Sequence, residues 1–117
     1  MDNQELENRL VQFSVNILEL QTYHHPNFGL QHLTKQLIRS SSSAALNYGE
    51  ARGAASRRDF IHKNRIVLKE LRESYNCLTI LVRSNLLSEI TSLKNEANEL
   101  VSIFVKLVRT AERNHKN

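Results

Sequence analysis

Apolar residues recur at alternating steps of three and four positions along nearly the whole chain. This period places them on one face of an α-helix, and no stretch shows the strict alternation of a half-buried strand. Proline and glycine, which interrupt helices, are scarce, because the 117 residues include one proline and three glycines. The sequence therefore predicts an all-α fold built from long amphipathic helices.

Four segments carry this spacing, and we expect helices at residues 3–23, 29–53, 57–84 and 88–113. Asp2, Ser56 and Ser88 suit the N-caps of the first, third and fourth helices, and Asn85 suits the left-handed residue that ends the third. Short loops make successive helices antiparallel neighbours. We therefore predict one domain, residues 1–117, folded as an antiparallel up-down-up-down four-helix bundle.

The four serines at residues 40–43 resemble a flexible linker between domains. However, Leu37, Ser41, Ala44 and Tyr48 continue the alternation through them, so the serines fall within a helical register. A serine inside a helix can donate its hydroxyl to the carbonyl one turn back. We expect a helix here, in which Ser41 and Ala44 let a neighbouring helix approach closely. A disordered serine linker is the alternative.

Positive charge is concentrated in residues 31–72, which hold nine Lys and Arg against three Asp and Glu. Arg58, Arg65, Lys69 and Arg72 are spaced by seven, four and three positions and therefore share one face of the third helix. Such a face attracts phosphate groups, and the few aromatic residues beside it favour contact with a nucleic-acid backbone over base stacking. The alternative is an ordinary solvated face paired with acids such as Glu70. The predicted nucleic-acid-binding residues are Arg39, Arg52, Arg57, Arg58, Lys63, Arg65, Lys69 and Arg72.

The chain carries no glycine-rich phosphate loop, paired-cysteine metal spacing or nucleophile elbow. Its single cysteine, Cys77, cannot form an internal disulfide. No histidine stands three residues after Glu50, Glu70 or Glu89, as a di-iron bundle would need. We therefore expect no enzymatic activity, metal, cofactor or small-molecule substrate. The polar, acidic start of the chain and the lack of a long apolar run predict a cytoplasmic protein with no membrane contact.

One bundle of this length leaves Tyr48, Tyr75 and several leucines without a place in its core. A second buried surface would cover them, so we expect a homo-oligomer. Glu50 lies in a segment otherwise rich in small residues, and we expect it to order a helix contact between subunits. A surface ion pair is the simpler alternative for this carboxylate. The predicted oligomer contacts are therefore Tyr48, Glu50 and Tyr75.

An ordered motif runs from Arg39 to Glu73. It begins with an Arg-Ser run and an Asn-aromatic pair before Glu, and it continues through a small-residue turn into Phe-Ile-His-Lys and Lys-Glu-x-x-Glu. This motif resembles the core of the four helix bundle proteins encoded in intervening sequences of bacterial large-subunit ribosomal RNA genes. The chain departs from the pattern at Asn76 and Cys77, and where serine and alanine replace a usual isoleucine or valine. The matching residues are Arg39, Ser40, Ser43, Ala44, Asn47, Tyr48, Glu50, Ala51, Ser56, Arg57, Asp59, Phe60, Ile61, His62, Lys63, Lys69, Glu70 and Glu73.

The resemblance covers nearly the whole chain and implies a four-helix bundle that assembles as a ring, usually a pentamer. It also relates the chain to the accessory variability determinant protein of diversity-generating retroelements, a basic barrel that binds RNA and a reverse transcriptase. We therefore expect a non-enzymatic bundle that binds nucleic acid, with a reverse transcriptase as a further candidate partner. The alternative is a structural homo-oligomer or protein-interaction adaptor with no nucleic-acid role.

Overall fold

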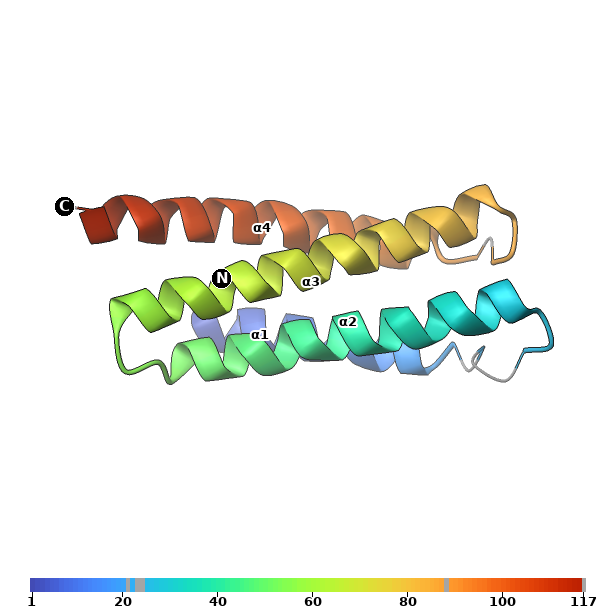
Figure 1. Ribbon diagram of the computed structural model, residues 1–117, viewed down its shortest axis with the longest axis horizontal. Helices are drawn as coiled ribbons and strands as arrows, with labels where there is room; N and C mark the ends of the chain where they lie inside the picture. The colour runs from blue at the N-terminus through green and yellow to red at the C-terminus, as the bar shows by residue number, and fades with distance from the viewer. Residues whose placement is uncertain (21, 23–24, 88, 117) are drawn as a thin grey trace.

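The computed structural model describes the whole chain except residues 21, 23–24, 88 and 117 and the side chain of Lys116. It contains four α-helices: α1 (Asn3–Leu18), α2 (Phe28–Arg52), α3 (Arg57–Arg83) and α4 (Thr91–Lys116). Successive helices run in opposite directions along a bundle that measures 52 × 22 × 21 Å (Figure 1). Each helix packs against two others, in the cyclic order α1–α2–α3–α4. The predicted all-α, up-down-up-down four-helix bundle is confirmed.

Side chains cap several helix ends and explain where the helices begin. The carboxylate of Asp2 accepts a hydrogen bond from the backbone N–H of Glu5 at 2.8 Å, and the hydroxyl of Ser56 accepts one from that of Asp59 at 3.0 Å. Both N-caps were predicted, because Asp and Ser satisfy N–H groups that a helix start leaves free. Asn27 caps α2 in the same way and was not predicted. Asn85, with φ of 59°, has the left-handed conformation expected after α3.

Two helices are shorter at one end than the spacing predicted. Helix α1 ends at Leu18 instead of residue 23, because the chain turns there and the hydroxyl of Thr22 lies 2.7 Å from that of Thr34 on α2. Helix α4 begins at Thr91 instead of residue 88, and the carbonyl of Ile90 accepts its first backbone hydrogen bond. The side chain of Ile90 is buried, so packing sets this helix start. The predicted cap Ser88 lies outside the described residues.

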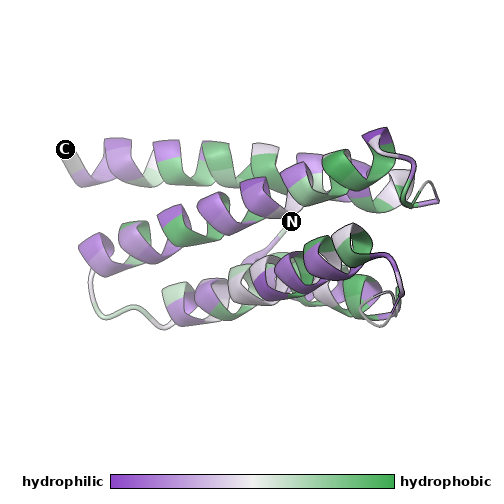
Figure 2. Cartoon of the chain, turned by 45° about the vertical axis from the view of Figure 1, so that its right-hand side comes forward, coloured by the Kyte–Doolittle hydropathy of each residue, from purple (hydrophilic) through white to green (hydrophobic). Residues whose placement is uncertain are grey.

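The four apolar stripes meet in one core along the bundle axis. Figure 2 shows apolar and polar positions alternating around each helix, as amphipathic helices require. The largest side chains that are fully buried come from all four helices. They include Leu10, Phe13, Leu37, Tyr48, Leu71, Leu78, Leu100 and Phe104.

The serine run at residues 40–43 is helical and lies within α2. Ser40, Ser41 and Ala44 are fully buried, and the Ser40 hydroxyl lies 2.7 Å from the hydroxyl of Ser74 on α3. The small side chains of Ser40 and Ser74 let α2 and α3 approach closely, and we call this contact the α2–α3 seam. The expectation of a helix is confirmed, and the alternative of a disordered linker is wrong.

Candidate nucleic-acid interface

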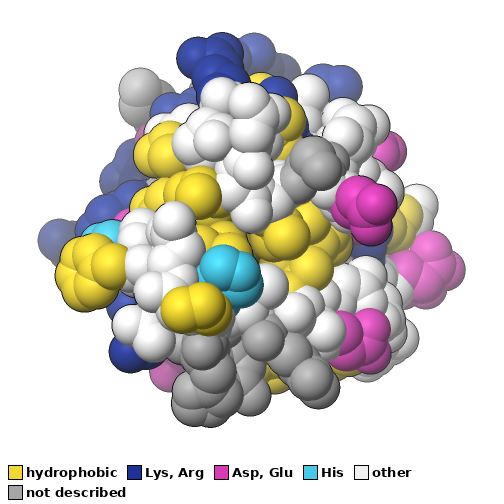
Figure 3. All heavy atoms as spheres, turned by 90° about the vertical axis from the view of Figure 1, so that its right-hand side faces the viewer, with side chains coloured by type: hydrophobic (Ala, Val, Ile, Leu, Met, Phe, Trp, Pro, Cys, Tyr) yellow, Lys and Arg dark blue, Asp and Glu magenta, His cyan; other side chains and the backbone are white. Residues whose placement is uncertain are grey.

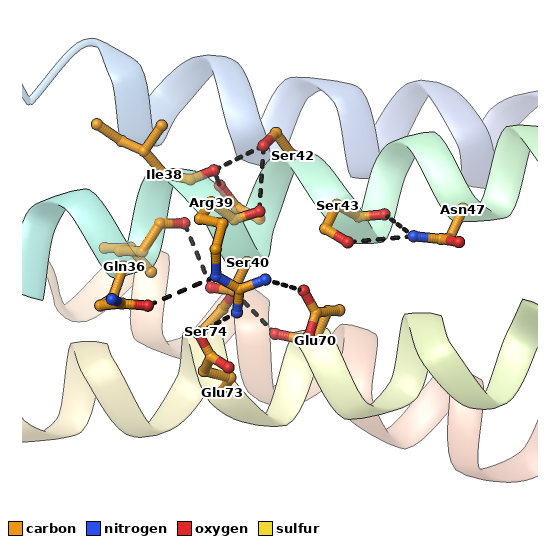
Figure 4. A network of polar contacts seen from close by, with 12 residues as sticks. Gln36, Ile38, Arg39, Ser40, Ser42, Ser43, Asn47, Glu70, Glu73 and Ser74 are labelled. Carbon is orange, nitrogen blue, oxygen red and sulfur yellow. Dashed lines mark hydrogen bonds and ion pairs between the residues drawn. The ribbon is translucent and has the colours of Figure 1, made fainter.

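Arg39 is held between two carboxylates at the α2–α3 seam. One guanidinium nitrogen lies 2.7 Å from a carboxylate oxygen of Glu70, and another nitrogen pairs with Glu73 (Figure 4). Hydrogen bonds to Glu70 and then to Glu73 raise the pKa of Arg39 above its ordinary value. Glu70 is buried, whereas half of the Arg39 side chain faces solvent. Arg39 therefore joins two helices, although it was predicted as a nucleic-acid contact.

Two further predicted bases also pair with acids of the bundle. Arg52 at the end of α2 lies 2.8 Å from a carboxylate oxygen of Glu7 on α1. The Lys63 ammonium lies 3.3 Å from a carboxylate oxygen of Glu50, across the turn between α2 and α3. Glu50 thus forms the ion pair that was the simpler alternative, and its contact with another subunit stays a prediction. These bases connect neighbouring helices.

The outer face of α3 carries the remaining row of bases, and we call Arg58, Arg65, Lys69 and Arg72 the outer ridge. All four residues are exposed, as their shared helical face predicted. Arg65 pairs with Glu112 on α4, and its side chain stays more than half exposed. Arg58, Lys69 and Arg72 form no ion pair with any carboxylate that the structure describes. The outer ridge is therefore a basic surface whose charge is largely accessible to a ligand.

Helix α4 adds bases that were not predicted. Arg109 and Arg113 are exposed on either side of Glu112, the residue that pairs with Arg65 of the outer ridge. In a view along the bundle, Lys and Arg gather on one side and most Asp and Glu on another (Figure 3). Arg57 lies apart from the ridge, with its guanidinium 5.6 Å from the ring centroid of Phe60. Nucleic-acid binding by Arg57, as predicted, would compete with this cation–π contact to Phe60.

A small notch opens between α3 and α4 beside the outer ridge, with a volume of about 190 Å³. Its lining residues are Arg58, Ile61, Arg65, Glu112 and His115. Glu112 and His115 were not predicted as site residues. They are three positions apart, which is the Glu-x-x-His spacing that Glu50, Glu70 and Glu89 lack. The described part of the chain contains no group of three or more His, Cys, Asp or Glu that would hold a metal ion. Apart from Ile61 and Glu112, the notch presents groups that donate hydrogen bonds to anions.

The two tyrosines predicted at subunit contacts differ in how far one chain buries them. Tyr48 is only 1% exposed, its ring meets that of Phe104 edge to face at 5.4 Å, and burial raises its pKa. The expectation that Tyr48 needs a second subunit to cover it is therefore wrong, because the bundle core covers it. Tyr75 is half-buried, with the Lys94 ammonium 5.9 Å from its ring centroid. Tyr48 therefore needs no second copy, whereas the contact of Tyr75 with another subunit stays a prediction.

Comparison with known proteins identifies the family. A family described as "23S rRNA-intervening sequence protein" matches residues 3–106. The chain belongs to this family. The family assignment agrees with the resemblance seen in the motif between Arg39 and Glu73. No curated protein matches the chain.

A solved structure supports the same family and the fold. The crystal structure of a protein of unknown function from the S23 ribosomal protein family of Bacteroides thetaiotaomicron superposes with a TM-score of 0.78 and 29% sequence identity. The match covers 88% of this chain and 97% of the Bacteroides chain. Among the residues described here, no helix is both long and apolar enough to cross a membrane.

Proposed function

We propose that this protein is a non-enzymatic bundle that binds the phosphate backbone of nucleic acid through the outer ridge. One observation carries the proposal: Arg58, Lys69 and Arg72 are exposed in one row, with no carboxylate partner among the described residues. Exposed, unneutralised bases in a row raise the local positive potential. The membership of an rRNA-intervening sequence family fits a setting that involves RNA. A reverse transcriptase, suggested by the sequence resemblance, is a further candidate partner.

The geometry of the ridge favours backbone contact. Arg58 and Arg72 are fourteen residues apart, which separates them by about 21 Å along a helix. Phe60, an aromatic residue within this stretch, is half-buried beside Arg57 and is poorly placed to stack on a base. Binding should therefore depend little on sequence and fall steeply with salt, because each phosphate that is neutralised releases condensed counterions.

The test replaces Lys69 and Arg72 together by Gln. A matched control, Asn8→Asp with Gln12→Glu, changes the net charge by the same amount on the exposed face of α1. Binding of fluorescently labelled RNA and DNA is measured by anisotropy across a salt series that starts at about 50 mM. The slope of log K against log salt is negative. We expect it to become shallower by about 1.5 in the ridge variant and to stay unchanged in the control. No binding by the wild type at the lowest salt would contradict the proposal.

A second candidate function is self-assembly, as a structural oligomer or adaptor. Val11, Val15 and Leu18 lie four and three positions apart on α1 and are 46%, 37% and 49% exposed. This apolar stripe lies on a helix whose core face is already buried, and such stripes mark protein contacts. We propose that a second copy covers it, in a ring of the size that the resemblance implies.

Light scattering tests the assembly. The expected mass is several times the 13.5 kDa of one chain, and Val15→Glu should reduce it, because a buried, unpaired carboxylate opposes association. A wild-type protein that stays monomeric at micromolar concentration would contradict the proposal. Oligomer mass is also measured for the ridge variant, which separates a loss of binding from a loss of assembly.

A further inference from the structure

The contact between Arg65 and Glu112 differs from the seam ion pairs in its surroundings. Both partners lie at the surface, with the side chain of Arg65 58% exposed and that of Glu112 37% exposed. At the seam, by contrast, the side chain of Glu70 is 6% exposed. An ion pair between exposed side chains is screened by solvent and adds little stability. Glu112 can therefore be displaced from Arg65 at small cost.

The pair also forms part of the notch between α3 and α4. Arg58 and Arg65 stand two helical turns apart on α3, and His115 faces the same space from α4. Guanidinium groups present forked donors that match the oxygens of a phosphate, and the walls leave about 190 Å³ for a ligand. Glu112 is the one acidic residue in the lining, and its carboxylate occupies Arg65.

We propose that this notch is a phosphate-group site and that Glu112 takes the place of the phosphate on Arg65 when the site is empty. A bound phosphate pairs with Arg58 and Arg65, and the carboxylate of Glu112 turns away toward solvent. For a backbone phosphate, the inference rests on the proposed nucleic-acid function and adds a defined site to it. A free phosphate ion offers the same chemistry, so the experiment has one arm for each source.

The first arm measures RNA binding by two variants that lose the same charge. Glu112→Gln frees Arg65, whereas Glu19→Gln removes an exposed carboxylate at the far end of α1. We expect Glu112→Gln to raise the affinity for a labelled RNA duplex about two- to fivefold, since little energy is needed to break an exposed pair. Its salt slope should become steeper by about 0.7–0.9, the contribution of one added phosphate contact. Glu19→Gln should change both quantities far less.

A double-mutant cycle shows whether Glu112 acts through Arg65. In the Arg65→Gln background, Glu112→Gln should give no more than the gain seen with Glu19→Gln, because the residue it frees is gone. An equal gain with and without Arg65 would overturn the inference and leave general electrostatics as the cause. Equal affinities of Glu112→Gln and Glu19→Gln, in a protein that binds RNA, would also overturn it and leave the proposed function standing.

The second arm titrates the wild type with inorganic phosphate at constant ionic strength, without RNA. NMR follows the Nε–H signals of the arginine side chains. Saturable shifts at Arg58 and Arg65, with the shift at Arg65 lost in Arg58→Gln, would support the site even if RNA did not bind and the proposed function failed. No shift with phosphate, together with no effect of Glu112→Gln on RNA binding, would overturn the site for both sources.

Discussion

Arg39 and Arg72 are both arginines of the basic middle of the chain, yet the fold gives them opposite surroundings. At the α2–α3 seam, Arg39 contacts the buried carboxylate of Glu70 and the carboxylate of Glu73. On the outer face of α3, Arg72 is exposed and meets no acid among the described residues. Helix packing thus divides the basic residues of this part of the chain into two kinds. Some join neighbouring helices, and others face solvent. Only the second kind has charged groups that no described carboxylate already occupies.

The largest expected effect comes from enlarging a small residue near the seam. Ala44 is fully buried in the core, one helical turn from Ser40, whose hydroxyl lies 2.7 Å from that of Ser74 on α3. Ala44→Leu should lower the free energy of unfolding by about 1–3 kcal/mol, because extra methylene groups have no space there. Leu46→Ala on the same helix serves as control, since Leu46 is 70% exposed. Equal melting temperatures for Ala44→Leu and the wild type would mean that α2 and α3 do not pack closely around residue 44.

The next effect separates the two arginines directly. Arg39→Ala leaves the buried carboxylate of Glu70 without the guanidinium of Arg39. The free energy of unfolding should fall by about 1–2 kcal/mol, which is less than for a fully buried pair because solvent screens the half-exposed Arg39. Arg72→Ala should change it by less than about 0.5 kcal/mol. Urea unfolding measures both variants. If Arg72→Ala proves as destabilising as Arg39→Ala, the division between seam and ridge is wrong.

A smaller effect concerns Cys77, which lies close enough to the seam for Glu73 and Arg39 to affect it. Burial, and then Glu73, raise the pKa of the Cys77 thiol. The unfolded thiol loses its proton at about pH 8.5 while the native thiol keeps it. The unfolded state therefore binds fewer protons, and stability falls as the pH rises. We expect a loss below about 1 kcal/mol by pH 9 that is absent in Cys77→Ala. Equal pH profiles of the two proteins in urea would argue against a buried thiol.

The smallest effect is expected at Ser42. Its hydroxyl donates to the backbone carbonyl of Ile38 at 2.8 Å, within the same helix, and the residue lies toward the surface. Ser42→Ala leaves no buried partner from another helix unpaired and improves helix propensity, so the stability change should be a few tenths of a kcal/mol at most. A thermal melt measures it. A loss of more than about 1 kcal/mol would show that Ser42 belongs to the seam.

The helices could be predicted from sequence because their signals are local. The spacing of apolar residues located all four, and Asp2, Ser56 and Asn85 marked ends by chemistry that acts within one turn. The ends set by tertiary contacts were missed: Thr22 meets α2, and buried Ile90 precedes α4. Similarly, the sequence did not indicate that the core has room for Tyr48. Its ring lies against Phe104 of α4, a contact that depends on how the helices pack.

The candidate interface was predicted only in part, because ion pairs between helices leave no local signal. Arg9 forms a two-pronged contact with Glu96 at 2.7 Å, although the residues are 87 positions apart. Arg65 and Glu112 likewise meet across 47 positions. Sequence spacing correctly placed the outer ridge on one helical face, since that face depends on α3 alone. It could not show which bases a neighbouring helix would neutralise.

The separation of charge across the bundle makes the molecule an electric dipole. Seen along the bundle, most Asp and Glu lie on a different side from most Lys and Arg (Figure 3), in a body 22 by 21 Å across. At physiological salt the Debye length is about 8 Å, so a polyanion at the ridge would hardly feel the acids on the far flank. At about 0.01 M salt the Debye length reaches about 30 Å and exceeds the width of the bundle. There, the field of a distant polyanion would exert a torque that turns the ridge toward it before contact.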